Sequence, residues 1–241
     1  MDAIKPKYLF KFVDIATAKK IIENNSLMFS HPSTFNDPFD CNIHQLYFDF
    51  NECCDAVAKD VRAIQNQHPG RHISDEIKIA GLRGAQEDKI ARCAVTCFSL
   101  NHYNTLLWSY YADKHFGACL EFDNHFEGKL MNHKDSEIAQ GVIDYDNEPI
   151  NYCKDKHEGI KKLFFSKSKD WAHEEEYRMS FLKKAGLYEF NKKFLKTICF
   201  GINTLDEEKS DIIRLTKKNG FSHLQFFQAY KDKLELKYKT H

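Results

Sequence analysis

The chain has 241 residues, which is enough for one large domain or two small ones with a sizeable core. Lysine plus arginine and aspartate plus glutamate number 35 each, so overall charge does not attract the chain to nucleic acid or to an anionic membrane. Because the first residues lack a signal-peptide core and no segment is apolar over the length of a membrane span, we expect a soluble, cytoplasmic protein.

Most of the predicted helices lie in the first half of the chain, together with four short strands. Asp14 is placed to cap a helix that reaches Asn24, Asn51 one that reaches Gln67, and Ser74 one that reaches Ile90. Apolar and aromatic runs predict strands between them, and the pattern at 104–114 predicts a fourth helix. The predicted strands are 7–13, 27–30, 93–99 and 117–122.

The second half of the chain is richer in strands. We predict a long loop at 124–140, helices at 158–169 and from the capping box Thr204–Glu207 to Gly220, and a turn at 230–232. The predicted strands are 141–145, the segment after Glu174, 195–200, 222–227 and 233–238. Since helices concentrate in the N-terminal half without regular strand–helix alternation, the sequence predicts a single α+β domain over residues 1–241.

Several common site types have no signature in this sequence. It contains no glycine-rich nucleotide motif, no nucleophile elbow and no zinc-protease motif. The eight cysteines form no Cys-x-x-Cys pair, and the twelve histidines do not stand at ligand spacing from them. We therefore expect free thiols and no bound metal.

The most informative segment is Trp171–Phe181, in which three consecutive glutamates enter a strand-like run. Side chains alternate along a strand, so Glu174, Glu176 and Arg178 are expected on one face. One interpretation is a cleft in which an arginine holds a glutamate ionised. The other is a solvated strand start with a Glu–Arg pair on an exposed face.

A second candidate is the loop 30–41, whose two prolines restrict the backbone and whose Asn36-Asp37-Pro38 favours a tight turn. Phe35, Asn36 and Asp37 are placed to clamp a ring and a ribose hydroxyl. The alternative is a structural Asx-turn with its phenylalanines in the core.

The third candidate is the aromatic stripe of the helix at 104–114, which follows the strand that ends at Ser99. Trp108, Tyr111 and His115 lie on one face if the helix continues that far. Such a stripe belongs either to a ligand cage or to the core.

Taken together, several short motifs resemble a bacterial family known as domain of unknown function 2971. They are Tyr8–Phe12, the loop 32–41, Cys97-Phe98-Ser99, residues 107–123, Lys169-Asp170-Trp171 with Glu174, Glu176, Tyr177 and Arg178, and Ile198-x-Phe200-Gly201. That family is distantly similar to the ADP-ribosyltransferase superfamily, including the DNA-modifying DarT toxins.

The resemblance implies a split, bent β-sheet with NAD⁺ as substrate in the cleft. It implies that Glu176, with Glu174 and Ser99, is catalytic, Ser99 or Tyr111 taking the middle-strand position. Where the superfamily has His or Arg on the first strand, this sequence has Tyr8 and Lys11. Residues that would bind NAD⁺ are Tyr8, Lys11, Phe35, Asn36, Asp37, Trp108, Tyr111, His115 and Arg178, with Lys11 or Arg178 at the pyrophosphate.

The function that follows is ADP-ribosyl transfer from NAD⁺ to nucleic acid, protein or water, as in a bacterial toxin or phage-defence system. Two other interpretations stay open. The same fold can serve as a non-catalytic binding or sensing module. A metal-dependent nuclease would use Asp37, Asp40 and Glu174 or Glu176 as oxygen ligands.

Overall fold

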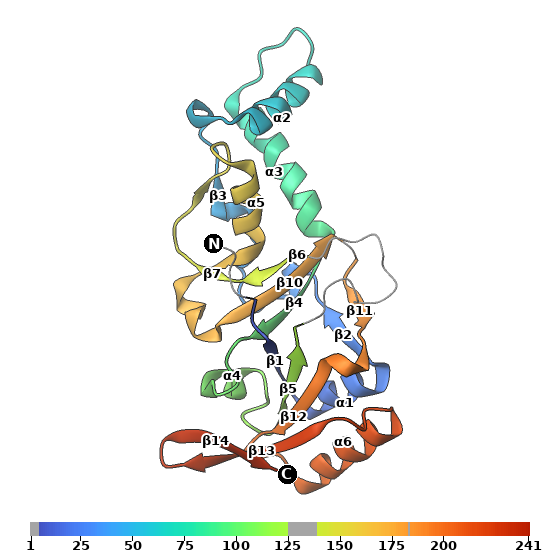
Figure 1. Cartoon of the computed structure of the whole chain (residues 1–241). Coiled ribbons are helices and arrows are strands. Elements are labelled where there is room, and N and C mark those ends of the chain that lie inside the picture. The colour runs from blue at the N-terminus through green and yellow to red at the C-terminus, as the bar shows by residue number, and fades with distance from the viewer. Residues whose placement is uncertain (1–4, 125–138, 183) are drawn as a thin grey trace.

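The structure is a computed structural model that describes residues 5–124, 139–182 and 184–241. It confirms the α+β class: an eight-stranded mixed sheet runs through an elongated molecule (Figure 1). One end is formed by α2 (Asp55–Asn66) and α3 (Asp75–Ala91). At the other end lie α6 (Asp206–Lys218) and the hairpin of β13 (Gln225–Asp232) and β14 (Glu235–Thr240). Most of the loop predicted at 124–140 lies outside the described residues.

The strand order of the large sheet is β14-β13-β12-β5-β1-β4-β10-β6. Only β12 and β13 are parallel among its pairs in the part of the chain described. Its other strands are β1 (Tyr8–Val13), β4 (Cys93–Ser99), β5 (Ala118–Asp123), β6 (Ala139–Val142), β10 (Glu176–Leu182) and β12 (Leu195–Phe200). Three small ladders pair β11 (Gly186–Glu189) with β2 (Ser26–Phe29), β3 (Leu46–Tyr47) with β8 (Ile150–Asn151), and β7 (Asp144–Tyr145) with β9 (Ser166–Lys167).

The sheet has one weak seam, between β1 and β4. Six residue pairs join β1 to β5 and seven join β4 to β10, but a single pair, Phe10 with Ser99, joins β1 to β4. The two strands therefore separate beyond this pair. The space between them needs side chains or a ligand to fill it.

Hydrophobic clusters cover the two faces differently. On one face α1 (Ile15–Asn24) and α6 pack over a single large cluster, which includes Leu9, Phe98 and Met179. On the other face two smaller clusters lie apart: one contains Phe10 and Phe12 of β1, the other Cys93 and Val95 of β4. Helices α4 (Thr105–Tyr110) and α5 (Lys156–Phe165) pack on this face, and α2 and α3 contribute Val57 and Leu82 to the second cluster. The polar strip between the two clusters lies at the seam.

The first helix forms as its sequence predicts. The Asp14 carboxylate accepts a hydrogen bond of 2.6 Å from the amide of Thr17, and Ile15, Ala18, Ile21 and Ile22 form the buried stripe. The predicted cap at Asn51 is wrong. Asp49 caps a short 3-10 turn, Phe50–Glu52, and α2 begins only at Asp55.

Three further boundaries differ from prediction. The fourth helix stops at Tyr110, because Asp113, Lys114 and His115 adopt positive φ angles of 43°, 52° and 70°. The fifth helix ends at Phe165, since the next two residues pair with β7 as strand β9. The turn of the last hairpin follows Asp232, with Lys233 at φ 57°, because β13 extends through the predicted turn.

The capping box at Thr204 is also wrong. Its hydroxyl donates to the carbonyl of Gly117 at 2.8 Å, so α6 starts at Asp206 without a side-chain cap. The C-terminal signal is correct, with Gly220 at φ 76° directly after the helix. Among the described helices, none combines the length and the apolar character needed to cross a membrane.

Candidate functional site

A row of three side chains crosses the seam of the sheet. Phe10 pairs with Ser99, and Ser99 pairs with Glu176. Residues directly opposite one another in antiparallel strands point to the same face, so all three belong to the face with the two small clusters. The register of β1, β4 and β10 therefore brings together residues that are far apart in the sequence.

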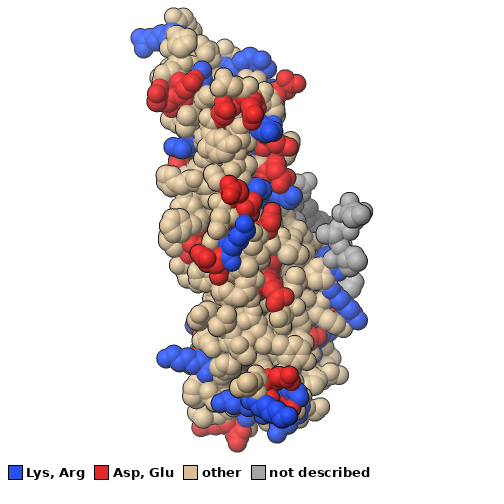
Figure 2. Space-filling view, turned by 90° about the vertical axis from the view of Figure 1, so that its left-hand side faces the viewer, with Lys and Arg blue, Asp and Glu red and all other residues tan. Residues whose placement is uncertain are grey.

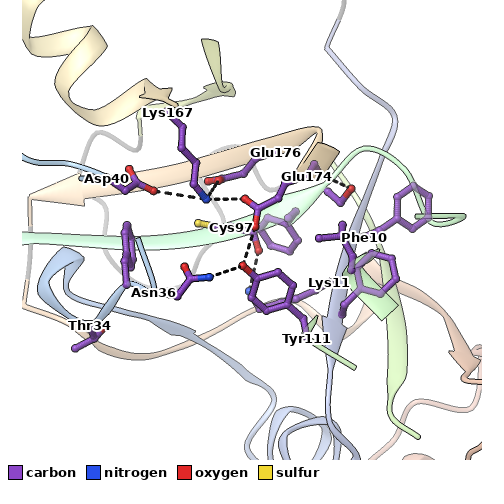
Figure 3. A pocket seen from close by; sticks show the side chains of 15 residues that line it. Phe10, Lys11, Thr34, Asn36, Asp40, Cys97, Tyr111, Lys167, Glu174 and Glu176 are labelled. Atoms are coloured by element: carbon purple, nitrogen blue, oxygen red, sulfur yellow. Dashed lines mark hydrogen bonds and ion pairs between the residues drawn. The ribbon is translucent and has the colours of Figure 1, made fainter. Parts of the chain in front are cut away.

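A pocket of about 330 Å³ lies over this row. Its walls are aromatic and apolar on the β1 side and charged on the β10 side, and side chains of the loop 34–40 complete the lining. It is lined by Phe10, Lys11, Phe12, Thr34, Phe35, Asn36, Asp40, Cys97, Phe98, Ser99, Leu107, Tyr111, Lys167, Glu174 and Glu176 (Figure 3).

Arg178 lies beneath the pocket and is fully buried. Its guanidinium donates to both oxygens of Asp40, at 2.9 and 2.7 Å, and to both oxygens of Glu176, at 2.6 and 3.2 Å. It also donates to the carbonyl of Phe164 at 2.9 Å and contacts the sulfur of Cys41 at 3.3 Å. Two bidentate pairs thus fix Glu176 in place.

Lys167 completes the charged wall. Its ammonium lies 2.6 Å from Glu174 Oε2, 3.6 Å from Glu176 Oε2 and 3.9 Å from Asp40 Oδ2, as Figure 3 shows. All four side chains are at most 7% exposed. Three buried carboxylates therefore share two cations, Lys167 and Arg178.

These contacts decide the ionisation of Glu176. Burial opposes its charged form, but Arg178 and then Lys167 outweigh burial and hold the pKa of Glu176 below its usual range. The same carboxylates outweigh the burial of Lys167 and raise the pKa of its ammonium. Glu176 is therefore a carboxylate at neutral pH. The first interpretation of the glutamate segment describes this geometry, and the exposed Glu–Arg pair is wrong.

Glu174 reaches the pocket by a route that the alternation pattern did not predict. It ends a 3-10 helix, Lys169–Glu174, and Glu175 follows with a φ of 44°. The strand therefore begins only at Glu176. Glu174 and Glu176 nevertheless both line the pocket, as the alternation predicts, while Glu175 between them is exposed.

Polar side chains form the opposite rim. The Tyr111 hydroxyl donates to Glu174 Oε1 at 2.7 Å, and the Asn36 amide donates to the Tyr111 oxygen at 3.1 Å. Burial and then the nearby Glu174 raise the pKa of Tyr111. Ser99 donates its hydroxyl to the Glu174 carbonyl at 2.8 Å. Hydrogen bonds thus join the phenol of Tyr111 and the hydroxyl of Ser99 to Glu174, and the ion pairs of Lys167 link Glu174 to Glu176.

Seven of the predicted site residues line this pocket, and five do not. Those in the lining are Lys11, Phe35, Asn36, Ser99, Tyr111, Glu174 and Glu176. Arg178 contacts Glu176 from below the pocket. Because its guanidinium is fully buried and bonded to protein groups, the predicted contact with pyrophosphate is wrong. Tyr8 lies at the start of β1, outside the lining.

Trp108, His115 and Asp37 also lie elsewhere. Trp108 is fully buried and donates its indole N–H to the carbonyl of His102, and the ring of His115 stacks on it at 6.0 Å. Trp108 belongs to the hydrophobic cluster that contains Phe10 and Phe12, and only Tyr111 of the stripe lines the pocket. Asp37 forms the Asx-turn of the alternative interpretation, accepting from the Phe39 amide at 2.9 Å.

The sequence analysis did not predict that Lys167, Phe10 and Phe12 line the pocket. It included Asp40 only as a possible metal ligand. Lys167 stands between two serines in a segment predicted to be helical, where a lysine is normally solvated. The rule that buried carboxylates need cationic partners could have pointed to a lysine such as Lys167.

The carboxylates of the nuclease interpretation do not form an open ligand set. Asp37 faces a different cavity, and Asp40, Glu174 and Glu176 surround the Lys167 ammonium, which stands where their charges converge. Within the described residues no group of three His, Cys, Asp or Glu side chains has the arrangement of a metal site. All eight cysteines are free thiols, as predicted.

On one face of the molecule, charge does not single out a partner. On the face shown in Figure 2, acidic and basic side chains are interspersed in small groups. Comparison of the chain with protein-family models, with curated proteins and with solved structures finds no match.

Proposed function

We propose that the pocket binds NAD⁺ and transfers its ADP-ribose group to an acceptor, which is nucleic acid, protein or water. The observation that carries the proposal is the ionised Glu176 beside Ser99, in a pocket at the seam where β1 separates from β4. This arrangement agrees with the split sheet, the serine and the glutamate that the family resemblance implies. A place in a bacterial toxin or phage-defence system is part of the same proposal.

The residues suit the chemistry of the nicotinamide–ribose bond. When that bond breaks, its electron pair leaves with nicotinamide and positive charge develops on the ribose. The Glu176 carboxylate stabilises this charge or orients the attacking group. The rings of Phe10, Phe12 and Phe98 provide apolar surface for nicotinamide and exclude water.

Arg178 and Asp40 have a supporting role in this proposal. Two bidentate contacts keep the Glu176 side chain in one rotamer and keep its carboxylate charged before substrate arrives. Such preorganisation lowers the cost of placing negative charge next to the reacting carbon. In the same proposal Lys11, which lines the pocket, replaces the His or Arg of the superfamily.

A second candidate is a non-catalytic binding or sensing module, and a specific observation favours it. Both oxygens of Glu176 already accept hydrogen bonds from Arg178, and the side chain is 4% exposed. A carboxylate that serves only to neutralise a buried arginine would have the same contacts. Turnover distinguishes the two candidates, whereas binding of NAD⁺ does not.

The test compares the wild type with Glu176→Gln and with the matched control Glu175→Gln. Glu175 is the adjacent but exposed carboxylate, and it accepts a hydrogen bond from Asn101 that glutamine also accepts. Nicotinamide release is measured with EDTA present, with and without lysate as acceptor, beside NAD⁺ binding by calorimetry. We expect Glu176→Gln to lower turnover on the order of 10²–10³-fold with little change in affinity. Binding without turnover in the wild type favours the binding module.

A further inference from the structure

Two lysines line the same pocket in opposite electrostatic settings. The ammonium of Lys167 lies among three carboxylates. Lys11, from β1, has only neutral partners: its Nζ lies 2.8 Å from the carbonyl of Cys97 and 3.1 Å from the hydroxyl of Thr96, over the ring of Phe98 at 5.1 Å. Among the described residues no carboxylate forms an ion pair with Lys11.

The position of Lys11 follows from the seam of the sheet. Where β1 and β4 separate, the carbonyl of Cys97 has no partner on β1, and the Lys11 side chain supplies the missing donor. Its Nζ is thereby held in place at the edge of the pocket rather than free in solvent. Lys11 is half-buried, and two neutral groups anchor its amine where an ion pair would be usual.

These contacts match the neutral form of the amine. A neutral amine has two N–H groups and one lone pair, and Lys11 has two hydrogen-bonding partners on β4. An ammonium in the same place would carry a third N–H and a half-buried charge that forms no ion pair with the described residues. Burial lowers the pKa of Lys11, although Cys97 and Glu176 act in the opposite direction.

We propose that Lys11 is a nucleophilic amine that forms an imine with an aldehyde held in the pocket. The Nζ lone pair attacks the carbonyl carbon, a C–N bond forms, and one amine proton passes to the carbonyl oxygen. The second amine proton then leaves with that oxygen as water, and a C=N bond remains. No electron is gained or lost, and hydrolysis reverses the step.

The lining indicates the class of aldehyde. Phe10, Phe12 and Phe98 surround the amine side of a pocket of about 330 Å³, so the group that bears the carbonyl is aromatic or otherwise apolar and small. This proposal does not depend on the proposed cleavage of NAD⁺, because imine formation with an aldehyde needs neither NAD⁺ nor an acceptor.

Reductive trapping tests the proposal on the native protein. Benzaldehyde is added at pH 7.5 with sodium cyanoborohydride, which reduces an imine to a stable secondary amine, and peptide mass spectrometry maps the modified lysines. Lys167 and the exposed Lys154 are comparators within the same molecule. A lowered pKa raises the fraction of Lys11 present as free base at pH 7.5, so we expect labelling of Lys11 to exceed that of either comparator severalfold.

Two controls keep the result specific. Lys11→Arg removes the labelled peptide, and the preference for Lys11 disappears in the urea-unfolded chain, where the fold no longer separates it from the other lysines. Labelling of Lys11 no greater than that of Lys154 in the folded protein overturns the proposal. A preference that persists after unfolding overturns it as well, because the pocket is then not its cause.

Discussion

Replacing Lys167 with methionine tests whether the buried charges of the pocket depend on one another. Methionine retains much of the length of the side chain but removes its charge, so Asp40, Glu174 and Glu176 then share the single cation of Arg178. Loss of one partner from a buried ion-pair group costs about 3–5 kcal/mol, because the charges left behind stay desolvated. We expect a loss of this size in the free energy of unfolding at pH 7.5.

The loss is expected to depend on pH. With two negative charges in excess, one carboxylate of the cluster binds a proton in the folded variant at a pH where the unfolded chain has released it. Folding then takes up a proton, so the stability of the variant rises as pH falls. Over two pH units the gain reaches up to about 2–3 kcal/mol. The defect of Lys167→Met is therefore expected to be smaller at pH 5.5 than at pH 7.5.

Urea unfolding at the two pH values measures both effects. Lys167→Arg retains the charge and is expected to recover most of the stability. Lys154→Met is the matched surface control: Lys154 is 71% exposed and lies 3.8 Å from Glu52, so its removal should cost less than about 1 kcal/mol. A loss at Lys167 as small as that at Lys154, or a loss equal at both pH values, would refute the reasoning.

Three other outcomes follow from single features of the structure. Tyr111→Phe removes the hydroxyl that donates to Glu174, and urea unfolding should show a loss of about 1 kcal/mol; no change would mean that water replaces this bond equally well. Gly201→Ala should lower the melting temperature sharply, because the added Cβ would lie 2.1 Å from the carbonyl oxygen of His115, and a stable variant would contradict that backbone contact. Acid titration of the wild type should show that Glu176, whose folded-state pKa is depressed, stabilises the fold above its ordinary pKa of 4.5. This contribution is lost as pH falls through the lower value in the folded state, and Glu176→Gln should make the acid limb shallower.

The sequence predicted the fold class and many elements because their signals are local. The helix after Asp14 has its cap, its stripe of four buried residues and its end within eleven positions. Predicted helix boundaries were wrong where a tertiary contact competed with a local signal. The hydroxyl of Thr204 bonds to Gly117, 87 residues away, instead of capping the helix that follows it. Nothing within the segment itself indicates that contact.

The candidate site was predicted in part for the same reason. The glutamates, Ser99 and Tyr111 stand in recognisable motifs, and the pocket brings them together. Arg178 was predicted to contact the ligand, but its guanidinium is buried in a pair with Asp40. Because Asp40 is 138 residues away, no local pattern indicates this pair. Lys167 was missed because the helix before it ends earlier than its sequence pattern indicates. Pairing of buried charges across the fold, rather than spacing along the chain, determines these roles.

The central claim is that Glu176 acts on bound NAD⁺ rather than only balancing Arg178. The most direct test is the rate of nicotinamide release at saturating NAD⁺ by the wild type, Glu176→Gln and Glu175→Gln, each shown to be folded by its unfolding curve. The account predicts release by the wild type and by Glu175→Gln, and a loss on the order of 10²–10³-fold in Glu176→Gln. Equal rates in all three proteins, or no release by a wild type saturated with NAD⁺ and supplied with lysate, would contradict it.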